Sequence, residues 1–332
     1  MFNPDHIFYE KNVEYYPLGK SLLDKYKNIP STIIENHNNI KELREKGNKD
    51  FPLLKRHLIL GTRKTHKYVE NHKVSDYLVP YTSSGCTAMC LYCYLVCHYN
   101  KCAYLRLFVN REEMLNKIIK TANNSEKDLT FEIGSNSDLI LENTLTNNLE
   151  WTIQNFAFQP KGYLTFPTKF DMVEPLLKLT HNRKIIIRMS VNPNEIIQKI
   201  ELGTSPLQNR IKAINQLVEA GYRVGILIAP VIFVENWKEL YRGLILKLEN
   251  TLSTEAKKHI FFEIIFMTYS YIHKAINTEA FPQTMDLYDK EKMKNRGLGK
   301  YTYKEEYRLE GEEYLKGLLA KHFPKNKILY FS

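Results

Sequence analysis

The cysteines of this chain are concentrated in one short stretch. All five fall within 17 residues, and the rest of the sequence contains none. They are Cys86, Cys90, Cys93, Cys97 and Cys102. A secreted disulfide framework would distribute an even number of cysteines along a short chain, so that class of protein is excluded. Clustered cysteines in an intracellular protein indicate metal binding or redox chemistry.

The spacing of the first three cysteines favours an iron–sulfur cluster. The segment GCTAMCLYC places Cys86, Cys90 and Cys93 within eight residues. Three thiolates on one tight loop suit three corners of a [4Fe–4S] cluster and leave the fourth iron for a ligand that is not protein. A zinc site is the alternative, because Cys90 and Cys93 form one pair and the later cysteines, or His98, could supply further ligands.

The sequence around this loop predicts strands that alternate with helices. Apolar runs rich in β-branched residues predict strands, and the longer segments between them have helical periodicity. The predicted strands are 57–60, 129–133, 162–166, 184–190, 223–229 and 259–266, and the predicted helices include 139–156, 172–179, 206–220 and 237–252. This alternation indicates βαβ units and a parallel sheet, either doubly wound or curled into an incomplete barrel. In a barrel, the active residues lie at the carboxyl ends of the strands.

Length and composition limit the class of protein. The 332 residues suffice for one barrel-sized domain or two smaller ones, and the hydrophobic and charged fractions of 43% and 25% are those of globular proteins. No stretch of 18 apolar residues and no secretory leader pattern occur, so we expect a cytoplasmic protein that does not cross a membrane. The formal net charge of +10 favours a polyanionic partner, although it also serves solubility.

The cysteine loop and its surroundings resemble a known family. An aromatic residue, Tyr92, precedes the third cysteine, as in the cluster loop of radical S-adenosylmethionine (SAM) enzymes. The segments GCTAMCLYCYL and YLRLFVN (104–110) resemble spore photoproduct lyase, a DNA-repair family within that superfamily. Further similar segments follow in order along nearly the whole chain: EYYPLGK (14–20), HLILGTRKT (57–65), SDYLVP (75–80), FEIGSNSD (131–138), TKF (168–170), SVN (190–192), GTSPLQNR (203–210), AGYRVGILIAP (220–230) and GLGKY (297–301).

The resemblance implies an α/β fold, an incomplete TIM-like (β/α)6 barrel. Residues 1–55 would form an N-terminal extension packed on the barrel. Residues 56–332 would form the radical SAM partial barrel, followed by a C-terminal β-hairpin and helical region that contacts DNA. We therefore expect effectively one domain.

The same resemblance implies two cofactors and assigns residues to them. Cys86, Cys90 and Cys93 would hold a [4Fe–4S] cluster, whose fourth iron binds S-adenosyl-L-methionine. The residues at positions that contact SAM in the family are Tyr92, Ser137, Lys169, Ser190 and Asn192. Lys169 follows a predicted strand, where a lysine could form a charge-assisted hydrogen bond with the SAM carboxylate.

The implied activity is that of a carbon–carbon lyase. A 5′-deoxyadenosyl radical derived from SAM would abstract hydrogen from C6 of the dihydrothymine in 5-thyminyl-5,6-dihydrothymine, the spore photoproduct, and two thymines would result. The implied partners are duplex DNA containing this thymine dimer and a reducing electron donor such as flavodoxin or ferredoxin. The implied location is the cytoplasm of a spore-forming cell.

One residue departs from the family at a chemically important position. Much of the family has a hydrogen-donating cysteine where this chain has Ser135. A serine O–H bond is too strong to replace a thiol readily, so we hypothesise that Cys97, one helical turn beyond Cys93, is the donor. Cys102 is the other extra thiol. Tyr94 matches a tyrosine thought to assist radical quenching and could relay the hydrogen atom.

The DNA-facing region also departs from the family. The family supports the opened duplex with a hairpin that carries an Arg-aromatic pair, but Arg296 is followed directly by Gly297 here and the hairpin looks shorter. The segment 290–301 is nevertheless strongly basic, and we expect Arg296 and Lys300 to contact phosphates. Met267 and Thr268 stand where the family tends to have His and Arg.

These departures leave two alternatives open. One is a radical SAM relative that acts on another nucleic-acid or nucleotide substrate. The other is a non-enzymatic zinc-binding nucleic-acid module.

Overall fold

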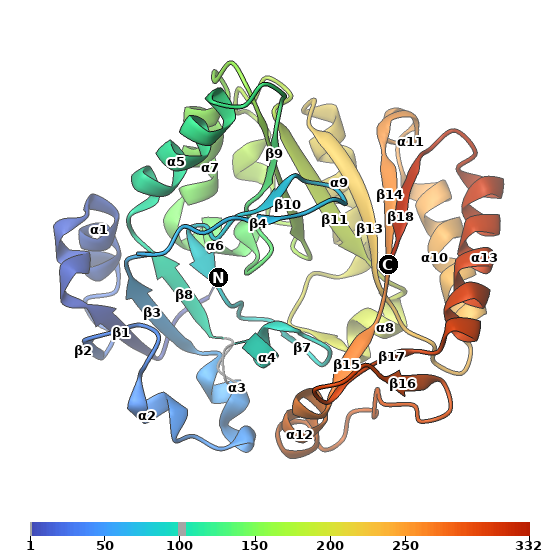
Figure 1. Cartoon of the computed structure of the whole chain (residues 1–332), viewed down its shortest axis with the longest axis horizontal. Coiled ribbons are helices and arrows are strands. Elements are labelled where there is room, and N and C mark those ends of the chain that lie inside the picture. The colour runs from blue at the N-terminus through green and yellow to red at the C-terminus, as the bar shows by residue number, and fades with distance from the viewer. Residues whose placement is uncertain (1, 99–103) are drawn as a thin grey trace.

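A large sheet curled into a half-barrel forms the framework of the molecule (Figure 1). The computed structural model describes residues 2–98 and 104–332, apart from the side chains of Cys97 and His98. The strand order of the sheet is β18-β14-β13-β11-β10-β9-β5-β4. The strands are β4 (Val69–Glu70), β5 (Tyr77–Leu78), β9 (Thr130–Glu132), β10 (Tyr163–Thr168), β11 (Ile185–Val191), β13 (Arg223–Val231), β14 (Phe261–Phe266) and β18 (Ile328–Phe331).

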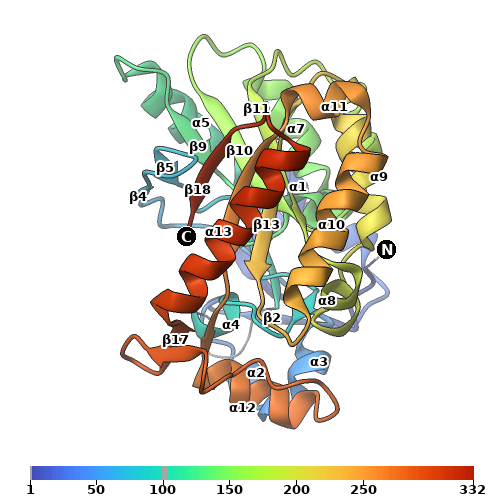
Figure 2. The same cartoon turned by 90° about the vertical axis from the view of Figure 1, so that its right-hand side faces the viewer.

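The (β/α)6 half-barrel expected from the sequence is confirmed. Within the described part of the chain, the six strands from β9 to β18 pair in parallel with their neighbours. The helices between these strands pack against the outer face of the sheet (Figure 2). They are α6 (Leu139–Thr146), α7 (Asn148–Phe156), α8 (Asn194–Lys199), α9 (Leu207–Glu219), α10 (Trp237–Thr251), α11 (Thr254–His259) and α13 (Glu305–His322).

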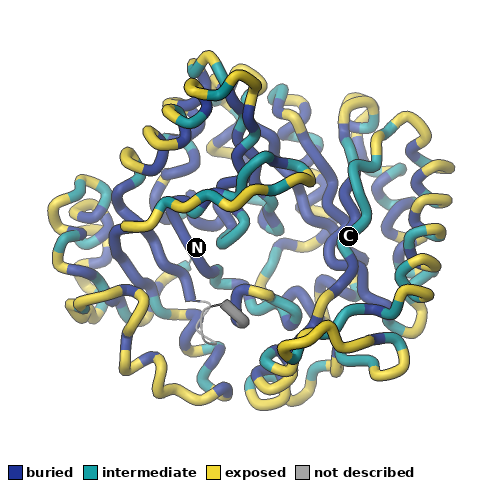
Figure 3. The backbone as a smooth tube through the Cα atoms, viewed as in Figure 1, coloured by how far each residue is buried: buried dark blue, intermediate teal, exposed yellow. Residues whose placement is uncertain are grey.

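The residue patterns explain these elements. Every residue of β11 is buried, as expected for a strand covered on both faces of a parallel sheet (Figure 3). Helix α9 buries Leu207, Ile211, Ile214 and Leu217, whose spacing of three and four residues places them on one face. The sheet and its helices therefore share one continuous apolar core.

A second sheet of five strands contains the N-terminal region. Its order is β2-β1-β3-β8-β6. Its strands are β1 (His6–Glu10), β2 (Ser31–Ile34), β3 (His57–Gly61), β6 (Ser83–Ser84) and β8 (Leu105–Phe108), and the accompanying helices are α1 (Pro17–Lys25), α2 (Lys41–Arg44) and α3 (Phe51–Leu54). Helix α5 (Arg111–Asn123) follows β8 and packs its apolar face into the core of the half-barrel. The prediction that the strand at 57–60 belongs to the half-barrel is wrong, because β3 pairs with β1 and β8. Strand β18, which we did not predict, completes the parallel set.

The C-terminal region contains the expected hairpin and helix. A three-stranded antiparallel sheet of order β15-β17-β16 is formed by β15 (Thr268–Ser270), β16 (Met293–Asn295) and β17 (Lys300–Tyr303), and α12 (Tyr271–Ala280) follows β15 directly. At the hairpin turn Gly297 and Gly299 have φ angles of 93° and 68°, a conformation that glycine adopts without strain. Leu298 between them also has a positive φ, of 51°.

The half-barrel is open on one side. Its edge strands are β4 and β18, and between them Lys73 lies over the ring of Tyr330 and donates to the hydroxyl of Ser332. In the described residues, no helix is long and apolar enough to cross a membrane.

Candidate active site

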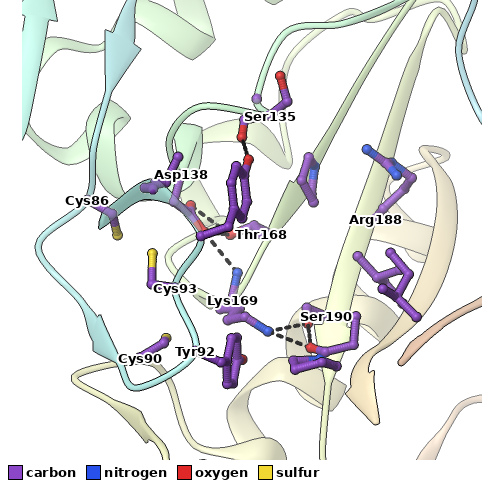
Figure 4. A pocket seen from close by; sticks show the side chains of 18 of the residues that line it. Cys86, Cys90, Tyr92, Cys93, Ser135, Asp138, Thr168, Lys169, Arg188 and Ser190 are labelled. Atoms are coloured by element: carbon purple, nitrogen blue, oxygen red, sulfur yellow. Dashed lines mark hydrogen bonds between the residues drawn. The ribbon is translucent and has the colours of Figure 1, made fainter. Parts of the chain in front are cut away.

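The three cysteines of the motif lie on one loop beside the carboxyl ends of β10 and β11. Within this loop β7 (Met89–Cys90) pairs with β12 (Glu201–Leu202), which sets Cys90 opposite Glu201. The side chains of Cys86, Cys90 and Cys93 are half-buried and line one cavity of about 420 Å³ (Figure 4). The structure thus brings together the three thiols that their spacing singled out.

These thiols fit an iron–sulfur cluster. The main-chain N–H of Ala88 donates to the Sγ of Cys86 over 3.4 Å, and such hydrogen bonds to sulfur tune clusters of this kind. Burial raises the pKa of the Cys86 thiol to about 12 and that of Cys90 further. Because the ligands of a cluster are thiolates, iron binding must displace these protons.

The main chain of the cysteine loop is held by three residues that the sequence did not reveal. Lys55, directly after α3, donates to the carbonyl oxygen of Cys86 over 2.7 Å. From α12, His273 Nε2 lies 3.0 Å from the carbonyl oxygen of Cys93, and Asn277 donates to that of Leu91 over 2.8 Å. Residues from both ends of the chain therefore fix the loop.

The Nε2 of His273 is the ring nitrogen that donates a hydrogen bond to the cysteine loop. The main-chain N–H of Ser270 donates to His273 Nδ1 over 3.1 Å, so the ring proton lies on Nε2 and faces the carbonyl oxygen of Cys93. Burial lowers the pKa of His273, which favours the neutral ring.

Most of the residues expected to contact SAM line the same cavity. They are Tyr92, Ser137, Lys169 and Ser190. The ammonium of Lys169 donates to Ser190 Oγ at 2.6 Å (Figure 4). It also donates to Glu201 at 3.0 Å and to the carbonyl oxygen of Ala229 at 2.8 Å. Its three protons are thus matched by three acceptors, and a SAM carboxylate has to replace one of them.

Glu201 is a central residue that sequence reasoning missed. Its carboxylate is fully buried and pairs with Lys169 and, at 2.8 Å, with the buried Arg210. It also accepts from Asn192 at 2.9 Å and from the hydroxyl of Tyr92. Burial alone would raise the pKa of Glu201. The positive charges of Lys169 and Arg210, together with these two hydrogen bonds, outweigh burial and lower the pKa to about 2.

Asn192 does not line the cavity. Its side chain is buried between Glu201 and Tyr241, whose hydroxyl donates to it over 3.1 Å. Direct contact with SAM therefore stays a prediction for Asn192, and in this structure it supports Glu201.

A second charged group lies deeper in the half-barrel. Arg188, in β11, pairs with Glu132 at 2.7 Å and with Glu263 at 3.0 Å. The hydroxyl of Tyr330 donates to Glu263 over 2.7 Å. Arg188, Glu132 and Tyr330 line the cavity, and burial raises the pKa of Glu132. Sequence reasoning assigned no role to these residues.

The residues of the hydrogen-donor hypothesis are only partly described. Ser135 and Tyr94 line the cavity, and the hydroxyl of Tyr94 donates to the main-chain oxygen of Ser135. The backbone of Cys97 lies in α4 (Leu95–His98), but its side chain is outside the described part of the structure, as is all of Cys102. The role of Cys97 stays a prediction.

The expected DNA contacts lie on the C-terminal hairpin. Arg296 and Lys300 are exposed. The main-chain N–H of Arg296 donates to the carbonyl oxygen of Lys300, and the N–H of Lys300 donates to that of Gly297, which closes the turn. Leu298 at the tip is 93% exposed. At the base of this sheet, Met267 and Thr268 line the cavity.

A half-barrel of parallel strands with a three-cysteine loop at the carboxyl ends of its strands defines a radical SAM enzyme. The comparisons with known proteins narrow this class. The chain belongs to the spore photoproduct lyase family, whose model matches residues 2–332.

The relatives agree with this assignment over their full length. Spore photoproduct lyase of Bacillus subtilis is 33% identical, and the alignment covers 100% of this chain and 99% of that protein. The enzyme of Clostridium acetobutylicum is 29% identical, with 98% and 97% covered. A solved structure of spore photoproduct lyase complexed with dinucleoside spore photoproduct has a TM-score of 0.92 at 29% identity, and covers 100% of this chain and 99% of its own. A mutant of spore photoproduct lyase was solved with bound AdoMet and the same dinucleoside.

Proposed function

We propose that this protein repairs DNA by converting spore photoproduct to two thymines. One observation carries the proposal: three thiols and the Lys169–Ser190 pair line a single cavity, in a chain that matches spore photoproduct lyases from end to end. A solved relative holds the dinucleoside lesion and shares the fold at a TM-score of 0.92. The substrate is therefore the thymine dimer itself, presented from duplex DNA.

The lining of the cavity supports a proposed place for each cofactor. Cys86, Cys90 and Cys93 would hold the [4Fe–4S] cluster, and Ser137, Lys169 and Ser190 would bind SAM. When bound, the two together supply a 5′-deoxyadenosyl radical. The chain's own contribution is position and exclusion of water: Lys169 offers a fixed positive charge to the SAM carboxylate, and apolar side chains such as Met267 cover the opposite wall.

Cys97 is the proposed hydrogen donor to the product thymine radical. Two observations support it: the position of the usual cysteine is occupied by Ser135, and Cys97 follows Tyr94, which lines the cavity, by three residues. The step breaks the S–H bond of Cys97 and forms a C–H bond on thymine, leaving a thiyl radical. Cys97→Ala should then give by-products in place of clean thymine, whereas Cys102→Ala should not. Clean repair by Cys97→Ala would contradict the role.

The partners follow from the chemistry. Duplex DNA would lie on the hairpin, with Arg296 and Lys300 at its phosphates. The cluster requires an external electron, for which a flavodoxin or ferredoxin of the cytoplasm of a spore-forming cell is the proposed source.

Repair of the isolated dinucleotide is the deciding experiment. The protein, reconstituted anaerobically and reduced with dithionite, should contain about four irons per chain. With SAM present it should convert dinucleotide spore photoproduct to the dithymidine dinucleotide, in which both thymines stay attached to their sugars. Full iron content and cleavage of SAM without any of this product would overturn the proposal.

The changes at Ser135 and Met267 favour one second candidate, a radical SAM enzyme acting on another nucleotide. This candidate predicts SAM cleavage that is stimulated by a different nucleotide and not by the thymine dimer.

A zinc-binding module is the remaining alternative. No three of the described His, Cys, Asp and Glu side chains are grouped to hold a single metal ion, so it depends on Cys97, His98 and Cys102. Metal analysis of the anaerobically purified protein separates zinc from iron.

A further inference from the structure

A second basic surface lies beside the cavity. We name it the strap, residues 63–75, which run from the end of β3 to the beginning of β5. The strap crosses the front of the molecule, where much of it is exposed (Figures 1 and 3). Its sequence, RKTHKYVENHKVS, contains four Lys or Arg residues and two His residues against a single acid.

The strap is fixed to the body of the protein by some of its side chains. Arg63 donates to the carbonyl oxygen of Tyr81 over 2.8 Å, and its guanidinium lies 3.8 Å from the ring centre of Phe108. Tyr68 packs its ring against Phe131, with the ring centres 6.1 Å apart. These anchors hold the neighbouring lysines in place on the surface.

Two lysines of the strap, Lys64 and Lys67, are exposed, and among the described residues neither forms an ion pair. Some surface lysines elsewhere pair with carboxylates, such as Lys127 with Asp76 and Lys238 with Glu310. Others, such as Lys316 and Lys321 of α13, form no ion pair with the described residues, but they lie on a helix rich in glutamate. An anchored segment with unpaired positive charge is suited to binding an anionic polymer.

The strap and the hairpin stand on opposite sides of the cavity opening. Asn71, Lys73 and Val74 of the strap line the cavity on one side, and Met267 and Thr268 at the base of the hairpin sheet line it on the other. Figures 1 and 2 place both elements on the same face of the molecule.

The outer helix α13 has the opposite charge. It carries five glutamates within nine residues, Glu305, Glu306, Glu310, Glu312 and Glu313. A polyanion is therefore attracted to the face of the strap and hairpin and repelled from α13.

We propose that the strap is a phosphate-binding surface which holds duplex DNA on the side of the cavity away from the hairpin, with Lys64 and Lys67 as its contacts. The inference rests on the proposed function. A dimer inside the duplex reaches the cavity only by leaving the base stack, so the duplex on both sides of the lesion must be held at the opening. The hairpin can hold one side, and the strap holds the other.

The test measures binding of an undamaged duplex to the reconstituted protein at several salt concentrations. In the variant Lys64→Ala/Lys67→Ala, the slope of log K against log salt should become shallower by about 2, because about one counterion is released per phosphate contact. At low salt the affinity should fall about tenfold or more. Lys64→Arg/Lys67→Arg should retain both properties. Lys316→Ala/Lys321→Ala, which removes two exposed lysines from α13, is the matched control and should change neither.

Repair of the dinucleotide separates this inference from the proposed function. The dinucleotide has no flanking duplex, so Lys64→Ala/Lys67→Ala should repair it at the wild-type rate while repair of the lesion in a duplex falls. If the double variant binds duplex DNA with the same affinity and salt slope as the α13 control, the strap has no such role. If the wild-type protein binds duplex DNA but does not convert the dinucleotide lesion to dithymidine dinucleotide, the proposed function fails, and the DNA-binding result for the strap is judged on its own.

Discussion

The carboxylate of Glu201 pairs with one buried cation, Arg210, and one half-buried cation, Lys169, and orients a third group. Lys169 and Arg210 both depend on it, and Tyr92 donates its hydroxyl proton to it. Because Glu201 lies opposite Cys90 in a two-strand ladder, it also connects the lysine expected to bind SAM with the cysteine loop. One side chain therefore aligns the two halves of the site.

Removing this charge should be costly. We expect Glu201→Gln to lower the free energy of unfolding by about 3 to 5 kcal/mol, since Arg210 is left buried without a counter-charge. It should also weaken SAM binding, measured by equilibrium dialysis on the iron-loaded protein. Urea denaturation provides the stability, and Glu195→Gln, an exposed carboxylate paired with Lys199, is the control. A Glu201→Gln variant as stable as this control would contradict the charge balance.

Leu298 combines exposure with backbone strain. An apolar side chain that is 93% exposed at a positive φ costs stability, so we expect Leu298 to act on a binding partner and not on the fold. Apolar wedges of this kind enter base steps and open the stack.

Leu298→Gly should therefore have opposite effects on stability and repair. We expect stability to rise by about 1 kcal/mol, because glycine adopts this conformation without strain. Repair of the lesion in a duplex should fall several-fold, and repair of the dinucleotide should not change. Leu298→Met keeps an apolar side chain and serves as the control. Equal duplex repair by the Gly and Met variants would exclude a wedge.

At the scale of elements, α12 connects the C-terminal hairpin with the cysteine loop. The helix begins directly after β15, and the main-chain N–H of Tyr271 donates to the carbonyl oxygen of Gly299 in the hairpin turn. Two of its side chains, His273 and Asn277, donate to carbonyl oxygens of the cysteine loop. The position of α12 therefore restrains the main chain of the cysteine loop.

Loss of the His273 hydrogen bond should loosen the cluster. We expect His273→Ala to lose iron to a chelator several-fold faster than the wild-type protein, monitored by the decay of cluster absorbance. His273→Gln keeps an N–H donor and should lie closer to the wild type. Identical decay rates for the alanine variant and the wild type would show that α12 does not restrain the loop.

For the molecule as a whole, buried carboxylates set the response to acid. Burial would raise the pKa of Glu10, but hydrogen bonds from His37 and Thr62 outweigh it and lower the pKa from 4.5 to about 2. Glu201 has a similarly low pKa. A carboxyl with a lowered pKa contributes stability that is complete above its unfolded value and is lost as the pH falls toward its folded value.

The stability that Glu10 and Glu201 contribute should therefore stay complete down to about pH 4.5 and be lost between about pH 4.5 and 2. Urea midpoints measured across this range provide the test. In Glu10→Gln the free energy of unfolding should fall by about 3 kcal/mol less on acidification than in the wild type. The variant starts from a lower free energy of unfolding at pH 7. An unchanged acid response in this variant would assign the transition to other groups.

Local patterns predicted most of the half-barrel and part of the site. Apolar runs such as 184–190 identify buried parallel strands, and the cysteine spacing identifies the loop. Sheet membership was not predictable, because β3 pairs with β1 across a long stretch of chain and β18 is only four residues long. The same limit applies to the site: His273 contacts a residue 180 positions away, and no spacing rule connects the two.

The opening between β4 and β18 determines how a substrate can reach the half-barrel. A ring of strands closed on itself would admit its substrate only through an end. Here β4 and β18 remain separate edges, and among the described residues no strand pairing joins them. A polymer of any length can therefore lie across the opening and offer two nucleotides from its middle. Repair at this site requires no free end, no threading and no cut in the chromosome.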